Sequence, residues 1–225
     1  MKILASLRER FHAARADLFI RLLRPTPGAT LLDLGGGDGS LAARICERVA
    51  LDVTVADIET DHRAAVEARG FRYVQLPASG PLPFRDREFD LVLCNSVIEH
   101  VTLPKERCRT TARVDPAVWK REARAAQQAF AKEVARVGRS YFVQTPHKHF
   151  PIDQHVLLPF VQYLPHNAAC RLVSWTDRFW IKSCWGIVDW ELFTASSLGA
   201  LFRGPIHVER FLGLPKSVVA YRRRR

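Results

Sequence analysis

The stretch LLDLGGGDGS, from Leu31 to Ser40, contains four glycines and two aspartates. Its glycines follow a short, mainly apolar segment. Residues 30–34 predict a short buried strand, and apolar side chains recur at helical spacing in the ten residues that follow the glycines. Glycines in such a turn let the backbone bend sharply and approach a ligand closely. The sequence therefore predicts a strand, a ligand-binding turn and a helix.

The spacing of the glycines separates this turn from two common phosphate-binding motifs. A P-loop ends in Gly-Lys-Ser/Thr, and this stretch has no lysine. The dinucleotide fingerprint G-x-G-x-x-G also fails, because Ser40 stands where the third glycine belongs. What remains is the pattern D-x-G-x-G-x-G, formed by Asp33, Gly35, Gly37 and Gly39.

The acidic residues near the turn indicate the chemistry of the ligand. Asp33, at the end of the predicted strand, suits a cationic amine and would repel a phosphate. The N–H groups that open the following helix suit a carboxylate. Asp57 closes a second predicted strand, where an acid in a doubly wound fold accepts hydrogen bonds from a ribose diol. An amino acid joined to a ribose points to S-adenosylmethionine.

These segments resemble the class I S-adenosylmethionine-dependent methyltransferases, in the small-molecule, type 11-like subset. LLDLGGGDGS resembles their first motif, VADIE their ribose-binding acid, and LPFRDREFDLVLCNSVIEHV their fourth strand and its sequel. The resemblance covers about residues 25 to 221. It implies a small-molecule methyl acceptor and a cofactor-binding set of Asp33, Gly35, Gly37, Gly39, Asp57 and Asn95. One departure is that residues 75–80 lack the acid that members often place near the adenine amine.

The hydrophobic pattern predicts an α/β fold with a doubly wound, mostly parallel seven-stranded sheet and helices on both faces. Further strands are expected over residues 71–75, 89–94 and 140–144, with enough chain before each for a crossover helix. A helix over residues 3–22 would end at Pro25, and a helix over residues 119–137 would have Gly138 as its C-cap. Residues 206–212 and 217–221 predict an antiparallel hairpin closed by a turn over residues 213–216.

We expect a single methyltransferase domain over residues 1–225. Residues 1–24 would be its N-terminal helix, residues 146–200 its substrate-side loop and helices, and residues 222–225 a basic tail. Residues 104–116, with four basic side chains at Lys105, Arg107, Arg109 and Arg113, resemble an insertion that forms a basic loop near the site.

Two histidines are the candidate catalytic residues. Methyl transfer from a sulfonium requires alignment of the reactants and exclusion of water, and a hydroxyl or acid acceptor must also lose its proton. His100 follows the fourth predicted strand and is the first candidate for the base. His155, in the loop after the fifth strand, is predicted to face the substrate from the other side. The alternative for Glu99 and His100 is a capping or packing role at a helix start.

The segment HKHFPIDQH, residues 147–155, gathers three histidines and an aspartate, but their spacing matches no closed metal motif. We therefore predict no metal there, and the resemblance suggests a substrate-facing loop instead. The loop continues into VLLPFVQYLP, and aromatic residues follow at Phe179, Trp180, Trp185 and Trp190. These apolar residues would form core helices or an amphipathic lid, and the core is the favoured interpretation.

The charge of the chain limits the classes of partner that it suits. The net charge of +11 and the arginines at 222–225 suit nucleic acid or an anionic membrane, but arginines are spread along the whole chain, which favours a generic basic surface. Residues 95–98 also lack the N/D-P-P-Y/F tetrad of base-amine methyltransferases. A nucleic-acid methyltransferase or basic nucleic-acid binder stays the alternative, and a cofactor-binding protein without catalysis is a third class. Peripheral membrane contact also stays open.

Five scattered cysteines without metal-ligand pairs predict a reducing, cytoplasmic location. No apolar run approaches the roughly 20 residues of a membrane span, and the first residues lack the features of a signal peptide. We therefore expect no transmembrane segment.

Overall fold

The computed structural model of the protein describes residues 2–103, 115–179 and 188–224. Most of the expected insertion over residues 104–116, together with Trp180 and Trp185, lies outside the described residues. The chain divides into two compact units. Unit 1 contains Met1–Asn95, Glu133–Val143 and Ala220–Arg225, and unit 2 contains Ser96–Lys132 and Gln144–Val219. The expectation of a single domain over residues 1–225 stays a prediction.

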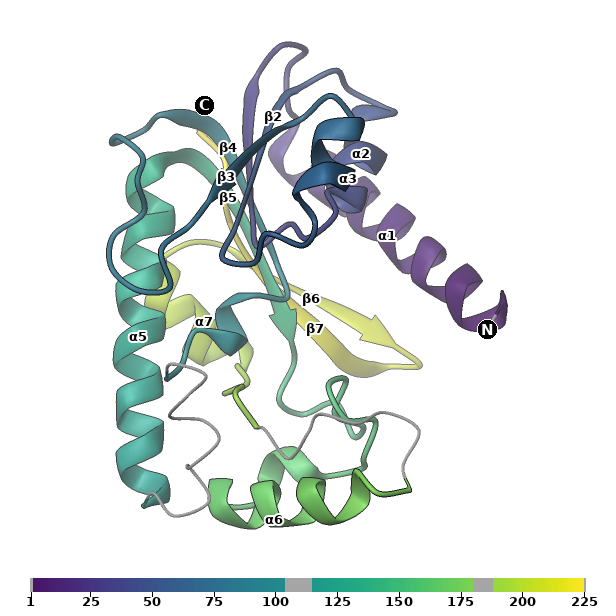
Figure 1. Ribbon diagram of the computed structural model, residues 1–225, viewed down its shortest axis with the longest axis vertical. Helices are drawn as coiled ribbons and strands as arrows, with labels where there is room; N and C mark the ends of the chain where they lie inside the picture. The colour runs from purple at the N-terminus through teal and green to yellow at the C-terminus, as the bar shows by residue number, and fades with distance from the viewer. Residues whose placement is uncertain (1, 104–114, 180–187, 225) are drawn as a thin grey trace. The chain divides into compact units, whose positions relative to one another are not determined.

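Seven strands form one sheet of order β3-β2-β1-β4-β5-β7-β6 (Figure 1). The strands are β1 (Thr30–Leu34), β2 (Asp52–Asp57), β3 (Arg72–Gln75), β4 (Phe89–Asn95), β5 (Gly138–Pro146), β6 (Ile206–Phe211) and β7 (Leu214–Arg222). The α/β fold with a mostly parallel sheet and an antiparallel C-terminal hairpin is therefore confirmed. Every predicted strand is present, with ends that differ by a few residues.

The central strands of unit 1 run parallel and end together. Leu34 of β1 pairs with Ala56 of β2 on one side and with Cys94 of β4 on the other. The three residues that come next, Gly35, Asp57 and Asn95, therefore stand in a row at the carboxyl edge of the sheet. This is the edge at which open α/β sheets bind their ligands.

Three helices of unit 1 accompany these strands: α1 (Lys2–Leu23), α2 (Ser40–Cys46) and α3 (Arg63–Ala68). Figure 1 draws them together on one side of the strands, and α1 packs against α2. Apolar side chains on one face of α1 are buried, and the ring of Phe19 lies 5.6 Å from that of Phe142 on β5. The predicted N-terminal helix, ending before Pro25, is confirmed.

The connection from β3 to β4 differs from the expected crossover helix. Residues 76–88 contain no helix and are held instead by side chains of the 133–143 segment of unit 1. Glu133 accepts a hydrogen bond from the Leu82 N–H at 2.8 Å, and the Arg136 guanidinium donates to the Leu82 and Phe84 carbonyls at 3.1 and 2.7 Å. Arg136 also bonds Glu133, which holds the pKa of that carboxyl below its ordinary value.

The long helix α5 (Pro116–Val137) confirms the periodicity prediction, but Gly138 has a different role from the predicted C-cap. Gly138 is the first residue of β5 and has no positive φ angle. A Cβ at this position would lie 2.5 Å from Cγ2 of Val92 and 2.9 Å from the Ser140 carbonyl oxygen. The glycine is therefore required by close packing of β5 on β4, and not by a left-handed backbone.

The C-terminal hairpin is confirmed, but its turn is shorter than predicted. Residues 212 and 213 alone connect β6 to β7, instead of residues 213–216. Leu212 and Gly213 both have positive φ angles, of 50° and 81°. Two such residues match the right-handed twist of a hairpin, and Leu214 is free to begin the next strand.

Unit 2 has its own core around η3 (Val161–Tyr163) and α6 (His166–Thr176), and it also contains η1 (Ile98–His100) and α7 (Ala195–Phe202). The favoured core interpretation of VLLPFVQYLP is confirmed for Val156, Leu158 and Val161, which are buried. It is wrong for Leu157 and Phe160, whose side chains are exposed. Of the downstream aromatics, Trp190 lies in the core, whereas Phe179 is exposed.

Candidate functional site

The carboxyl edge of unit 1 carries a cavity of about 330 Å³. Its lining comes from β1 and the glycine turn, the end of β4, helices α1 and α2, and the residue directly before α3. The lining residues are His12, Asp33, Gly35, Gly36, Gly37, Asp38, Ser40, Leu41, His62 and Asn95. Four of the predicted cofactor residues, Asp33, Gly35, Gly37 and Asn95, therefore face one cavity.

Asp33 is the most unusual group at this cavity. Its side chain is 2% exposed, and Oδ2 has no hydrogen-bond partner among the described residues. Burial, together with the nearby carboxylates of Asp57 and Asp38, raises its pKa to about 7. Gly36 makes room for it, since a Cβ at Gly36 would lie 2.5 Å from Cγ of Asp33. A buried carboxylate at a cavity, with other carboxylates nearby, suits a cationic ligand group.

Asp57 and Asp38 hold the turn in shape. The backbone N–H of Gly37, a residue with a φ of +54°, donates to Oδ2 of Asp57 at 3.2 Å. Oδ1 of Asp57 accepts the N–H of Glu59 at 3.1 Å. Asp38 accepts the N–H of Ser40 at 3.1 Å, so one of the N–H groups expected to receive an anion is already bonded. Asp57 and Gly39 do not line the cavity itself.

Helix α1 contributes two residues that the sequence analysis did not single out. His12 lines the cavity, and the Arg15 guanidinium donates to Oδ1 of Asn95 at 2.8 Å. The two positions lie three residues apart, on one face of the helix. Polar side chains on this face of the helix could have indicated a binding role. Their partner could not be predicted, because Asn95 lies 80 positions from Arg15 in the chain.

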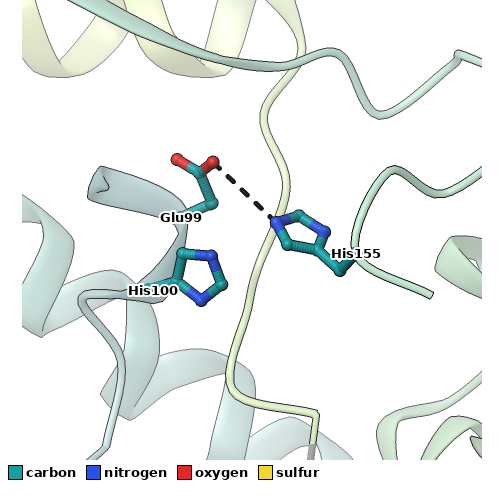
Figure 2. Close-up of side chains that lie close together, drawn as sticks. All are labelled: Glu99, His100 and His155. Atoms are coloured by element: carbon teal, nitrogen blue, oxygen red, sulfur yellow. Dashed lines mark ion pairs between the residues drawn. The ribbon is translucent and has the colours of Figure 1, made fainter. Parts of the chain in front are cut away.

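A second group of polar side chains lies in unit 2 and contains both predicted catalytic histidines. The helical turn η1 carries Glu99 and His100, and the loop after β5 carries His155. The two imidazole rings are 4.8 Å apart and nearly perpendicular, and Nε2 of His155 lies 3.9 Å from Oε1 of Glu99. Figure 2 shows the carboxylate and the two rings side by side. The structure thus brings His100 and His155 together.

Each of these histidines is oriented by a further carboxylate. Nδ1 of His100 lies 2.9 Å from Oδ1 of Asp189, and Nδ1 of His155 lies 3.2 Å from Oδ1 of Asp153. Trp190 donates its indole N–H to Oδ2 of Asp153 at 3.1 Å and stacks on the His155 ring at 4.5 Å. Burial lowers the pKa of His155, but the carboxylates of Asp153 and Glu99 outweigh burial and raise it to about 9.

The other histidines of the HKHFPIDQH segment have different partners. His147 accepts the His149 backbone N–H on Nδ1 at 3.0 Å, and Nδ1 of His149 lies 3.1 Å from the Tyr163 hydroxyl. Within the described ranges, the one group of three side chains arranged to hold a metal is Glu99, His100 and His155. Among the described residues, the histidines of this segment do not form a metal-ligand group of their own, and the absence of a metal there stays a prediction.

Unit 2 also has a cavity of about 360 Å³. Aromatic and aliphatic side chains of α5, η3 and α6 line it, with Lys120, Lys148 and Glu191 as charged groups. Trp119 stacks on His166 in its wall at 3.8 Å, and burial lowers the pKa of His166 to about 4. Trp190 belongs both to this wall and to the histidine cluster, so the two features adjoin.

Comparison with known proteins agrees with this geometry. Residues 32–115 match a family model described as a methyltransferase domain. This part of the chain, less than half of it, is similar to class I methyltransferase domains. The matched segment includes the whole glycine turn, Asp57, Asn95, Glu99 and His100, whereas His155 and all lining residues of the unit 2 cavity lie beyond it.

Curated relatives match a part of this chain. An uncharacterized methyltransferase of Mycobacterium sp. (strain JLS) is 41% identical over 92 residues, which are 40% of this chain and 36% of that protein. The ubiquinone/menaquinone biosynthesis C-methyltransferase UbiE of Xanthomonas oryzae pv. oryzae (strain MAFF 311018) is 35% identical over 101 residues, 40% of each chain. The chain thus matches well under half the length of these relatives.

A solved structure is similar in fold over nearly all of this chain. A candidate O-methyltransferase from Nostoc punctiforme PCC 73102 aligns with a TM-score of 0.57 and 12% identity, over 98% of this chain and 58% of that one. At this identity the likeness concerns the fold alone. Among the described residues, no helix has the length and apolarity needed to cross a membrane.

Proposed function

We propose that this methyltransferase domain transfers a methyl group from S-adenosylmethionine to a small-molecule acceptor. The observation that carries the proposal is the buried Asp33 carboxylate, which faces a cavity at the carboxyl edge of the sheet without a hydrogen-bond partner for Oδ2 among the described residues. An ammonium group would neutralise it, and the amino-acid end of the cofactor provides one.

The residues around the cavity fit the rest of the cofactor. Asp57 would accept hydrogen bonds from the ribose hydroxyls, as acids at this position do in doubly wound folds. The turn from Gly35 to Gly39 would let the backbone approach the ligand, and Asn95 would close the cavity from the end of β4. When bound, S-adenosylmethionine supplies an electrophilic methyl group on a sulfonium. The protein's share is to align the acceptor and keep water away.

We assign the acceptor side to the histidine cluster and the adjoining cavity of unit 2. His100 follows Asn95, the last of the proposed cofactor residues, by a few positions in the sequence. A cavity of about 360 Å³ suits a small molecule, whose sites typically measure about 300–1,000 Å³. Its aromatic walls suit a ring or apolar chain, and Lys120 and Lys148 suit a negatively charged substituent.

The relatives support a small acceptor. The Xanthomonas protein is named for ubiquinone and menaquinone biosynthesis, and this name supports a small-molecule acceptor for the present chain. The net charge of +11 and the arginines at 222–225 suit nucleic acid, but the alternative of a nucleic-acid methyltransferase is not favoured. A cytoplasmic location and peripheral membrane contact stay predictions.

Transfer of a labelled methyl group to an unbiased mixture tests this proposal. The protein is incubated with methyl-labelled S-adenosylmethionine and separated small-molecule, lipid, RNA and protein fractions of a cell extract. We expect label in a small-molecule or lipid fraction, and less label when Asp57→Ala protein is used at the same subsaturating cofactor concentration. Label confined to RNA or protein would refute the small acceptor, and no label in any fraction would refute the transfer activity.

A further inference from the structure

The Glu99 carboxylate is the starting point for a metal site. Its side chain is fully buried, and neither Oε1 nor Oε2 has a hydrogen-bond partner among the described residues. A buried carboxylate without such partners is costly, and proteins compensate it with a cation, a hydrogen-bond network or a metal. Glu99 is also held firmly in place, because its carbonyl accepts the Glu191 N–H at 2.9 Å.

The two histidines beside Glu99 have the outer contacts that metal ligands usually have. A histidine that binds a metal through one ring nitrogen commonly gives the other nitrogen to a carboxylate, which fixes the ring and raises its basicity. Asp189 contacts Nδ1 of His100, and Asp153 contacts Nδ1 of His155. The Trp190 indole in turn fixes Asp153. Each ring thus contacts a carboxylate through Nδ1, and both rings lie close to Glu99.

The distances leave space for an ion. One ligand atom from each of Glu99, His100 and His155 lies within 4.8 Å of the others. Tetrahedral coordination at bond lengths of about 2.0–2.2 Å separates ligand atoms by roughly 3.4 Å, so adjustments of about 1 Å would close the site. The 3.9 Å from Oε1 of Glu99 to Nε2 of His155 is too long for a hydrogen bond but close to this separation.

We propose that Glu99, His100 and His155 bind a divalent transition-metal ion through one carboxylate oxygen and one nitrogen of each histidine. Two histidines and one carboxylate are ligands typical of Zn²⁺, Fe²⁺ and Mn²⁺ sites that keep open coordination positions. An open position would accept an oxygen atom of a ligand in the adjoining cavity, next to Trp190. The site is defined by its own residues and does not rest on methyl transfer.

The competing explanation is a network of charges without an ion, in which a protonated His155 lies between Asp153 and Glu99. In this network His100 pairs with Asp189 and has no role between Glu99 and His155, although its ring lies 4.8 Å from that of His155. A metal accounts for all three side chains at once. Direct metal binding distinguishes the two explanations.

Metal binding is measured on the full chain purified without a histidine tag and stripped with chelator. Zn²⁺, Mn²⁺ and Co²⁺ are titrated separately by calorimetry, with Co²⁺ absorption as a second readout of coordination. The variants are Glu99→Gln, which keeps the shape of the side chain, and His155→Ala. Asp153→Asn tests the outer carboxylate, and His149→Ala is the matched control, since His149 lies on the same segment but contacts Tyr163. Circular dichroism checks that each variant is folded.

We expect about one equivalent of at least one of these ions to bind the wild type and His149→Ala alike. Glu99→Gln and His155→Ala should weaken binding more than tenfold, and Asp153→Asn by about 10–100-fold, the usual effect of an outer partner. Absence of stoichiometric binding in the folded wild type would overturn the proposal, and so would equal binding in folded His155→Ala. Neither result bears on S-adenosylmethionine binding, which is measured separately.

Discussion

The backbone N–H of Gly37 donates a hydrogen bond to Oδ2 of Asp57 at 3.2 Å, which ties the turn after β1 to the end of β2. Oδ1 of the same carboxylate accepts the N–H of Glu59. The acid proposed to hold the ribose is therefore fixed by two backbone groups before any ligand arrives. Such preorganisation lowers the entropy cost of binding.

Asp57→Ala should weaken S-adenosylmethionine binding by about 1.5–3 kcal/mol, the usual loss for a hydrogen bond to a charged group. Calorimetric titration of folded wild-type and variant protein measures this. Asp52→Ala is the matched control, because Asp52 is an exposed aspartate at the opposite end of the same strand. Equal affinity of Asp57→Ala and wild type for S-adenosylmethionine would show that Asp57 does not bind the ribose.

Asp33 should make the ligand-free protein less stable as the pH rises. Its pKa is raised to about 7 in the folded protein, above the ordinary value of 3.8, so the folded state holds the proton more tightly than the unfolded chain does. This stabilising contribution is complete below about pH 4 and is lost as the pH rises through 7. Asp33→Asn removes the titration.

Urea unfolding at pH 5 and pH 8 checks this. We expect the free energy of unfolding of Asp33→Asn, relative to wild type, to be higher at pH 8 than at pH 5, by on the order of 1 kcal/mol or more. The same difference between variant and wild type at both pH values would show that Asp33 does not titrate in this range.

The variants Gly138→Ala and Gly138→Asn distinguish two reasons for a glycine at this position, close packing and a helix C-cap. If the glycine is required because β5 packs closely on β4, both variants should lower the free energy of unfolding, by about 1–3 kcal/mol for alanine and more for asparagine. A left-handed C-cap would instead tolerate asparagine better than alanine. Denaturant unfolding shows which of the two variants has the lower free energy of unfolding. A smaller loss for Gly138→Asn than for Gly138→Ala would contradict the packing explanation.

The strands and the glycine turn were predictable because their signals are local. Continuous apolar runs bounded by polar residues mark β1, β2 and β4, and the D-x-G-x-G-x-G spacing marks the turn. Gly138 was recognised as special, but the sequence could not tell a backbone requirement from a packing one. That distinction depends on Val92, which lies on another strand.

The contacts that complete the candidate sites were not predictable, since they join residues distant in the chain. Arg15 meets Asn95 across 80 positions, and His100 meets Asp189 across 89. Spacing within HKHFPIDQH could not show that His155 lies against Glu99 and His100, while His149 contacts Tyr163. Only folding brings such groups together, so sequence patterns named the histidines but not their partners.

Calorimetric titration of the stripped, folded protein with S-adenosylmethionine and its demethylated product tests the central claim most directly. We predict one site with micromolar-range affinity for both, a melting temperature raised by each ligand through mass action, and loss of binding in Asp33→Asn. No heat with either ligand, in a protein that binds a nicotinamide dinucleotide instead, would contradict it.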